Sequence, residues 1–574
     1  MKRCQQCNRI EPDDALAFCR VDGAPLVTAD ESVVSEDAAT RTLPSSGSAS
    51  SKQSAARPTG ATTVLDQSGE SATREVVRPK RRRVLFLATG VVTVILAVAL
   101  AYIYRTPTSA TSDKNSIAVL PFVNASGDPN MEYLSDGISE SLINSLSQLP
   151  NMRVMARSTT FSFKGKDSDP SAIGRTLGVN AVLTGRVVQL GDNLTVQADL
   201  VNVSDGSQLW GERFNGKATD LISVQEEIAR KIVDKLSLRL SGADRSRLTK
   251  RYTENVEAYR SYLKGRYEWN KRTGEGLKAA VDFFNHAIAL DPTYALAHAG
   301  LADTYALFPQ YTNEPFEESL NKAKAESLKA LESDNSLAEA YISRANVNHA
   351  LWDWNGVEED YKRGLALNPN YATGHQWYSE YLVVMGRLDE AEKEISLAQQ
   401  LDPMSLIINV RLGMTFYFAR HFDLAEKQLR DALQFDPDFI LTNVFLSSVL
   451  LQQGKFEEAI PYIVKGTFNG FSATERRGFE SSIRTAYEKS GTKGGWETIR
   501  DLASRSERRD YSYPMTMAMM SVDLKDRDAA FIWLKRAADV KHPGIATLKV
   551  DPSVDYLRDD PRFQELIKRI GLNP

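Results

Sequence analysis

The sequence predicts a multidomain chain: a short cysteine knuckle, a disordered linker, a single transmembrane helix, a small α/β domain with a mixed sheet, and an all-α superhelix of helical repeats. Three observations predict this order. An uncharged apolar run occupies residues 84–104, strand and helix patterns alternate over residues 116–241, and prolines recur with a 34-residue period after residue 256.

The composition is that of ordinary globular domains, with 42% hydrophobic and 25% charged residues. The length of 574 residues leaves room for several domains. The net charge of −4 shows that basic residues are not in excess, so no nucleic-acid partner is expected.

The head, residues 1–27, contains all three cysteines of the chain. Cys4 and Cys7 form a C-x2-C pair, and Cys19 with Asp22 repeats that spacing with a carboxylate as the fourth candidate ligand. Four such ligands suit tetrahedral zinc, which would stabilise a segment too short to fold on its own core. Two alternatives stay open: a metal-free or redox-sensitive tail, and an Asp22 that only shapes the Asp-Gly turn.

The head sequence CQQCNRIEPDDALAFCRVDGAPL resembles short zinc-ribbon-like heads with an FCxxDGxxL ending, which occur in bacterial membrane-anchored regulators. The resemblance is confined to this head and implies a structural zinc ion. Residues 28–79 are rich in Ser, Thr, Ala, Gly and acidic residues and have no periodic apolar face. They are predicted to be a disordered linker.

Residues 84–104 are predicted to be the transmembrane helix, because 21 helical residues span about 31 Å, close to the thickness of a bilayer core. The run begins too far along the chain for a secretory signal, so an uncleaved anchor is expected. Four basic residues at 80–83 precede it and Arg105 alone follows. The positive-inside bias therefore places the N-terminus in the cytoplasm and the C-terminal domains in the periplasm, on the bacterial inner membrane. The alternative is a buried core helix.

Residues 116–241 are predicted to form the α/β domain with its mixed sheet. Asp136 and Glu140, one helical turn apart, are expected on the solvated face of their helix and not in a catalytic site. The predicted elements, in order, are a strand at 117–122, a helix at 131–149, a strand at 154–155, a helix at 172–177, a hairpin that turns at 191–193, a strand at 206–216 and a helix at 221–240.

Two stretches, IAVLPFVNASGDPNMEYLSDGISESLINSL and LTGRVVQLGDNLTVQADLVNVSDGSQLWGERF, resemble the domain related to the amino-terminal part of TolB. The resemblance depends on the LPF-N-SGD opening and the LW-ER ending. In bacterial membrane regulators this domain precedes tetratricopeptide repeats and often follows a winged-helix or nucleotide-cyclase effector. Neither effector is recognisable in this sequence, so DNA binding and cyclase activity are not carried over.

The rest of the chain is a series of helical repeats. Pro369, Pro403 and Pro437 follow one another at 34-residue intervals, and Asn335 stands in the same register. Small residues recur where paired helices must pack closely, and proline ends the second helix of each pair. The period is that of tetratricopeptide repeats and predicts six helix pairs over residues 256–470, then degenerate helical repeats and a capping tail over 471–574. An insertion at 308–316 is expected in an inter-helix loop.

The resemblance to tetratricopeptide proteins implies that a protein or peptide binds in a concave groove lined by the first helices. Candidate partner-binding residues are polar or aromatic and lie early in these helices, and each has an alternative role as a solvated helix residue. They are His298, Tyr341, His375, Asn409 and Asn443.

No phosphate-binding loop, nucleophile elbow or zinc-protease motif occurs in the sequence, and all six histidines lie in the repeat region without metal-ligand spacing. The predicted function is therefore that of a non-enzymatic, single-pass membrane protein whose exterior domains bind protein or peptide partners, as a signalling or regulatory adaptor. The alternatives are a static periplasmic scaffold for envelope assembly or secretion and, less favoured, an enzyme on the α/β domain. Structural zinc is the only cofactor expected.

Overall fold

The computed structural model describes residues 2–4, 10–11, 26–28, 115–166, 168–312, 314–505 and 511–573. The predicted transmembrane helix at 84–104 and nearly all of the predicted linker lie outside these residues. In the part of the chain that is described, no helix combines the length and apolar character needed to cross a bilayer.

The N-terminal residues form a small antiparallel sheet that belongs to a compact unit of its own. β1 (Lys2–Cys4) lies between β2 (Ile10–Glu11) and β3 (Leu26–Thr28). Cys4 is the last residue of β1, whereas Cys7, Cys19 and Asp22 lie outside the described residues.

A mixed sheet follows, as predicted, with the order β6-β4-β7-β8-β9 and β5 (Val123–Asn124) paired to β7. β4 (Ser116–Val119) is parallel to β6 (Arg153–Val154) and to β7 (Ala181–Leu190). β8 (Asn193–Asn202) and β9 (Gln208–Lys217) continue it in antiparallel order. Gly191, with a φ of 57°, supplies the left-handed conformation of the predicted hairpin turn.

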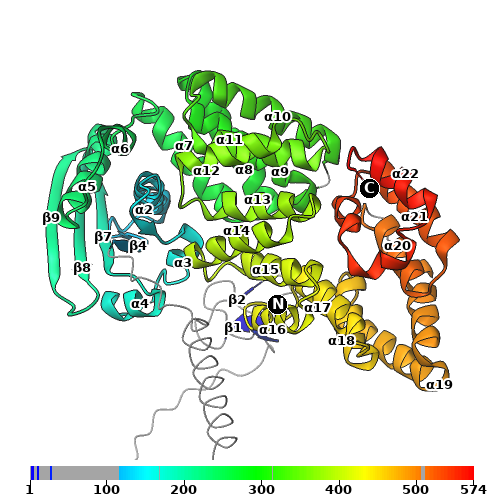
Figure 1. Ribbon diagram of the computed structural model, residues 1–574. Coiled ribbons are helices and arrows are strands. Elements are labelled where there is room, and N and C mark those ends of the chain that lie inside the picture. Colours follow the sequence, from blue (N-terminus) through cyan, green and yellow to red (C-terminus); the bar gives the residue numbers. More distant parts are fainter. Residues whose placement is uncertain are drawn as a thin grey trace, which may run out of the picture. The chain divides into compact units, whose positions relative to one another are not determined.

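Helices cover both faces of this sheet (Figure 1). α2 (Glu132–Ser147) and α5 (Leu221–Lys235) pack on one face through buried Ile138 and Ile228, and α4 (Pro170–Leu177) packs on the other through Ile173. The predicted helices are confirmed, although α5 ends five residues early. Two short helices, α3 (Arg157–Phe161) and α6 (Gly242–Leu248), were not predicted, because so few residues show no helical period.

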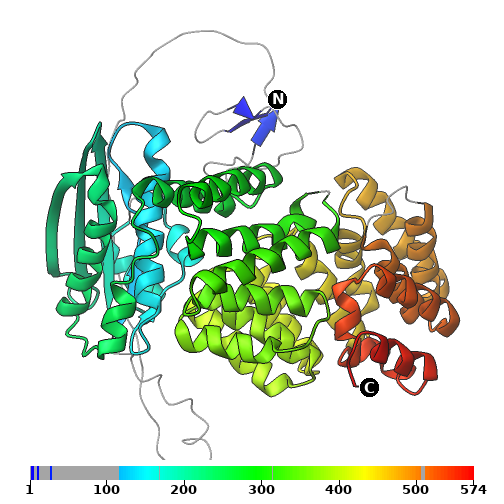
Figure 2. The same cartoon turned by 90° about the horizontal axis from the view of Figure 1, so that it is seen from above.

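The next region is a tetratricopeptide-like helical array that runs from Val256 to Thr467 (Figure 2). Within the described chain it contains six helix pairs, which confirms the predicted number. The helices are α7 (Val256–Asn270), α8 (Gly274–Leu290), α9 (Ala295–Tyr311), α10 (Phe316–Ser333), α11 (Ala338–Ala350), α12 (Val357–Leu367), α13 (Ala372–Val384), α14 (Leu388–Leu401), α15 (Leu406–Phe418), α16 (Phe422–Ala432), α17 (Ile440–Gln452) and α18 (Phe456–Thr467).

Small residues allow the paired helices to approach closely. A Cβ atom on Gly413 of α15 would lie 2.7 Å from Leu429 Cγ of α16. The turn inside each later pair has a positive φ, at Gly386, Arg420 and Gly454, as their shared register predicts.

The insertion at 308–316 was expected in a loop, and this expectation is wrong for most of it. α9 continues through Pro309 to Tyr311, and Phe308 is buried. Phe316 begins α10 and stacks on Tyr511 of the C-terminal region, with ring centroids 5.4 Å apart. Aromatic packing therefore stabilises the inserted residues in a helical, partly buried conformation.

The C-terminal region packs around its own apolar core. This region, predicted as degenerate helical repeats with a capping tail, includes a complete helix pair at residues 513–523 and 527–539. Its elements are α19 (Ala473–Arg505, interrupted at Gly491), α20 (Tyr513–Asp523), α21 (Arg527–Asp539), η3 (Pro543–Lys549), η4 (Pro552–Leu557) and α22 (Pro561–Arg569).

Candidate functional site

A buried ionic cluster joins the α/β domain to the first helix of the repeats. Glu140 of α2 is 5% exposed. Its Oε1 accepts a hydrogen bond from Arg266 Nε at 2.7 Å, and its Oε2 accepts one from Asn270 Nδ2 at 2.9 Å, both from α7. Arg157 Nε of α3 lies 2.9 Å from Glu140 Oε2 as an ion pair. One carboxylate therefore holds α2, α3 and α7 together.

The expectation that Asp136 and Glu140 face solvent is wrong, because α7 and the segment after α3 cover that face of α2. Burial alone would raise the pKa of Glu140, but the charges of Arg266 and Arg157 hold that pKa below its usual value. Asp136 is different: burial raises its pKa, although Lys164 Nζ lies 2.6 Å from its Oδ1 and opposes that rise.

A second set of contacts follows the turns between successive helix pairs. We number these inter-repeat turns one to five, at residues 291–294, 334–337, 368–371, 402–405 and 436–439. The segment after α6 contacts turns one and two: Thr253 Oγ1 donates to Asp291 at 2.6 Å, and Lys250 Nζ donates to Asp334 at 2.5 Å.

The α/β domain itself contacts turns three and four. Asn370 of turn three donates from Nδ2 to the carbonyl oxygen of Ser147 at 2.9 Å. In turn four, the Asp402 carboxylate accepts hydrogen bonds from Ser158 Oγ and from Thr159 Oγ1, the latter at 2.6 Å. Four successive turns on one edge of the array are therefore bonded to residues that precede the repeats.

The five predicted partner-binding residues occupy one structural position. Each directs a side-chain polar atom to the carbonyl oxygen six residues earlier, in the preceding inter-repeat turn. The pairs are His298 Nε2 with Pro292 at 3.3 Å, Tyr341 Oη with Asn335 at 3.0 Å, His375 Nε2 with Pro369 at 3.0 Å, Asn409 Nδ2 with Pro403 at 2.9 Å and Asn443 Nδ2 with Pro437 at 3.2 Å.

These contacts give the five residues a role in closing the turns. His298, His375, Asn409 and Asn443 are buried, and Tyr341 is partly buried. A peptide in the groove would have to reach side chains already bonded within the chain. Their role in partner binding stays a prediction, and the shared six-residue spacing to a turn carbonyl was the sequence signal for the structural role.

His375→Asn should keep the turn bond and cost less stability than His375→Ala. Asparagine stands at the equivalent positions 409 and 443 and makes this bond there. The alanine variant should cost about 2 kcal/mol, because the Pro369 carbonyl loses its hydrogen-bond partner and Glu394 loses the 2.6 Å contact with Nδ1. Urea unfolding measures both, and equal losses for the two variants would contradict the proposed turn bond.

The C-terminal region contacts the opposite ends of several first helices. Tyr417 Oη of α15 donates to Asp551 Oδ1 at 2.9 Å, and Trp354 Nε1 donates to the Ile570 carbonyl oxygen at 2.7 Å. Both are long-range contacts between the repeats and the chain's last described elements. Trp354 therefore packs between the repeats and the C-terminal region.

Asp523→Asn is expected to stabilise the protein above neutral pH. Burial raises the pKa of Asp523 to about 7, the charge of Asp551 adds to the rise, and Lys525 opposes it. Because the folded state disfavours the carboxylate, stability falls as the pH rises from about 4, where unfolded aspartate ionises, to about 7. The variant should gain about 1–3 kcal/mol at pH 8 and nothing at pH 4.

Urea unfolding at several pH values tests this expectation. Asp528→Asn is the control, since the Asp528 side chain is 86% exposed. A gain for Asp523→Asn that does not depend on pH would contradict the titration of Asp523.

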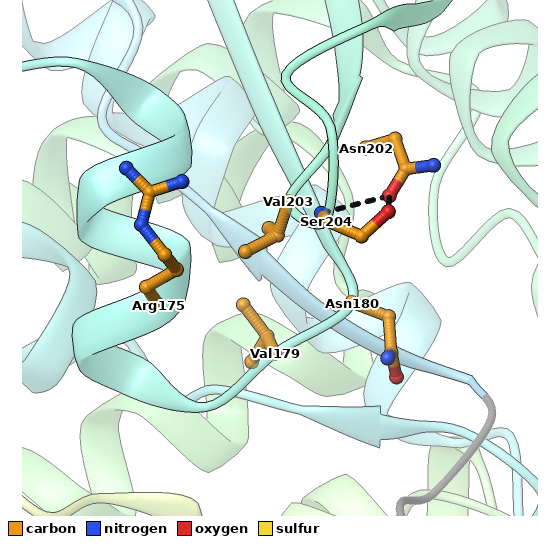
Figure 3. A pocket seen from close by; sticks show the side chains of 6 residues that line it. All are labelled: Arg175, Val179, Asn180, Asn202, Val203 and Ser204. Carbon is orange, nitrogen blue, oxygen red and sulfur yellow. Dashed lines mark hydrogen bonds between the residues drawn. The ribbon is translucent and has the colours of Figure 1, made fainter.

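A pocket of about 380 Å³ lies beside α4, between this helix and the residues that precede β7 and follow β8 (Figure 3). Asn202 Oδ1 accepts hydrogen bonds from the Ser204 backbone N–H and hydroxyl, and Asn180 Oδ1 accepts one from Ser116. These groups order the local loops and include no nucleophile paired with a base. The lining residues are Arg175, Val179, Asn180, Asn202, Val203 and Ser204.

Within the described ranges, no three His, Cys, Asp or Glu side chains are grouped so that they could hold a metal ion. The predicted zinc ligands Cys7, Cys19 and Asp22 are not among those residues, so the head site stays a prediction.

The α/β domain matches a known family. Residues 112–231 match the second domain of HilA/YgeH-like transcriptional regulators. The matching family is not named for TolB, so the TolB resemblance also stays a prediction.

Curated proteins with two different names are similar to parts of the chain. "Putative adenylate cyclase 3" of Rhizobium meliloti (strain 1021) is 32% identical over 234 residues, 40% of each chain. "Transcriptional regulator HilA" of Salmonella typhimurium (strain LT2) is 22% identical over 309 residues, 53% of this chain and 54% of that protein. A solved structure, that of TTC0263, a thermophilic tetratricopeptide-repeat protein in Thermus thermophilus, is 20% identical and covers 34% of this chain and 99% of its own, with a TM-score of 0.29. That score is too low to support an argument, and the chain spans about half the length, or less, of the curated relatives it matches.

Proposed function

We propose that the chain is a non-enzymatic, single-pass membrane protein whose α/β domain and repeat array lie outside the membrane and bind a protein or peptide. In this proposal it acts as a signalling or regulatory adaptor with a cytoplasmic zinc-binding head. Arrays of helix pairs offer extended surfaces for protein or peptide ligands, which favours a binding role.

The observation that carries the proposal is the row of hydrogen bonds between four successive inter-repeat turns and the residues that precede the repeats. The Glu140 cluster adds a buried ionic contact to the same junction. Because the α/β domain is bonded to the array at several places, a ligand on the repeats would act on the whole exterior part, and not on a freely hinged domain.

The matches to these relatives support a binding or regulatory role of the shared region more than a catalytic role. One matching protein is named an adenylate cyclase and another a transcriptional regulator, each over about half of its length or less. Proteins with different named activities share binding and regulatory modules more readily than catalytic centres.

Affinity capture from native membranes tests the adaptor role. Full-length protein is compared with a chain that lacks the repeats and with one that lacks the head. Partners lost only with the repeats, together with different partners lost only with the head, would support a two-sided adaptor. Exterior partners that are indifferent to the head would favour a static periplasmic scaffold instead.

The proposed topology has its own test, because the cysteines of this chain all lie in the head. Leu190, at the tip of the β7–β8 hairpin, is 65% exposed. With the native cysteines changed to serine, Leu190→Cys should react with a membrane-impermeant maleimide in intact spheroplasts. In the wild-type chain, which keeps Leu190 and the head cysteines, the maleimide should label the head cysteines only after lysis. The reverse pattern would place the α/β domain and the repeats on the cytoplasmic side of the membrane.

The proposed zinc site is tested by the metal content of purified full-length protein, expected at about one zinc per chain. Cys19→Ser should abolish it. Asp22→Asn should lower it if the carboxylate is a ligand and leave it unchanged if Asp22 only shapes the turn. Full zinc content in Cys19→Ser would exclude this ligand set.

A further inference from the structure

Inter-repeat turn five exposes an apolar patch whose equivalent at turn four is covered. Phe435 is 45% exposed, whereas Leu401, one repeat earlier, is 1% exposed. Val444 is 37% exposed, whereas its equivalent Val410 is fully buried. Ile440, one helical turn before Val444, is 44% exposed. We define Phe435, Ile440 and Val444 as the turn-five patch.

Turn four shows what kind of segment covers such a turn. The backbone N–H of Ala156 donates to the Leu401 carbonyl oxygen at 2.9 Å, so a small residue lies against the end of α14. Ser158 and Thr159 then donate their hydroxyls to Asp402. The Thr159 hydroxyl also accepts a hydrogen bond from the Met404 backbone N–H at 3.0 Å. The covering segment thus has the pattern Ala-x-Ser-Thr.

Turn five repeats the chemistry of turn four, but no segment of the described chain covers it in the same way. Asp436 stands where turn four has Asp402, and the hydrogen bond that its Oδ1 accepts within the described residues comes from the local backbone N–H of Asp438, at 2.9 Å. Lys465 of α18 bonds to the Pro437 carbonyl oxygen at 3.0 Å, on the same turn. Among the described hydrogen bonds, none from residues 115–253 reaches turn five.

The edge formed by the turns is therefore an interface that residues 147–253 contact at turns one to four, and that the described residues leave open at turn five. Figure 1 shows α3 beside α14 and α15, with α16 and α17 following in the array. The open turn continues the occupied row, because consecutive helix pairs stack on one another.

We propose that turn five is a docking site for a segment of a partner protein that carries a small residue followed, two and three positions later, by hydroxyl residues. This segment donates its backbone N–H to the carbonyl oxygen of Phe435, which follows α16, and its hydroxyls to Asp436, and it packs its apolar side chains on the turn-five patch. The inference rests on the proposed binding function and names the site and the chemistry of the partner.

The first probe is a synthetic peptide that copies residues 153–165 of this chain, RVMARSTTFSFKG, labelled with fluorescein. Its binding to purified full-length protein is followed by fluorescence anisotropy. Phe435→Asp and Asp436→Ala should each weaken binding at least about tenfold, as expected for central contacts of an interface. A peptide with alanine in place of Ser158 and Thr159 should bind equally weakly.

Leu424→Asp is the matched control, because Leu424 is also an apolar residue of this array, 50% exposed, but lies near the start of α16. This variant should bind the peptide as the wild type does. Thermal unfolding of Phe435→Asp should match that of the wild type, which separates lost binding from lost folding.

Three outcomes would overturn the proposal. The peptide fails to bind, or binds regardless of Phe435→Asp and Asp436→Ala. Its binding is lost in Asp402→Ala but not in Phe435→Asp, which would mean that it replaces α3 at turn four. Wild-type protein self-associates in sedimentation and Phe435→Asp does not, which would make a second copy the occupant. If the repeats capture partners from membranes while the peptide does not bind, the proposed function stands and this inference fails.

Discussion

Glu140→Gln is expected to lower the free energy of unfolding by about 3–5 kcal/mol, because it removes one partner of a buried ionic cluster. The Arg266 side chain, 17% exposed, would keep its charge without a carboxylate opposite it. Arg157 would lose its contact as well. Urea unfolding measures the loss, and a change in slope would report partial separation of the α/β domain from α7.

The same variant should change the dependence of stability on pH. The pKa of Glu140 is lowered in the folded protein, so its stabilisation is present above the unfolded value of about 4.3 and is lost as the pH falls through the folded pKa. The difference between wild type and Glu140→Gln should therefore be constant above about pH 5 and shrink in more acidic solution.

Glu132→Gln is the control for this prediction. Glu132 lies on the same helix and pairs with Lys164 at 2.6 Å, but its side chain is 30% exposed. Its loss should cost less than about 1 kcal/mol. If Glu132→Gln and Glu140→Gln lowered the free energy of unfolding equally, burial of the Glu140 cluster would contribute nothing to stability.

Phe284→Ala should also cost about 3–5 kcal/mol, because it opens a cavity where α7, α8 and α9 meet. Phe284 is fully buried. Its ring lies so close to the backbone of Gly265 and Gly300 that a Cβ atom on either glycine would approach it within 2.7 Å. The ring thus fills the space that these two glycines leave.

Phe435→Ala provides a matched control for Phe284→Ala. Phe435 is 45% exposed, so its truncation should change the free energy of unfolding by less than about 0.5 kcal/mol. It should still weaken binding of the peptide probe. A large stability loss for Phe435→Ala would mean that this residue belongs to the core and not to an open surface.

The sequence by itself determined the order of the elements. The alternation of strand and helix patterns predicted the mixed sheet, because side chains on strands and helices follow periods of two and 3.6 residues. The spacing of Pro369, Pro403 and Pro437 predicted six helix pairs, because each pair contacts its neighbours in the same way and so keeps the same small residues and turns.

Only the tertiary structure decided which polar residues are buried and what they contact. Glu140 has the helix position of a solvated residue and is buried because α7, more than a hundred residues later, folds against it. Asp402 and Asp436 look alike in sequence, yet one is covered by α3 and the other is not. A repeat's sequence reflects its nearest neighbours, whereas contacts from a distant domain depend on where the chain returns in space.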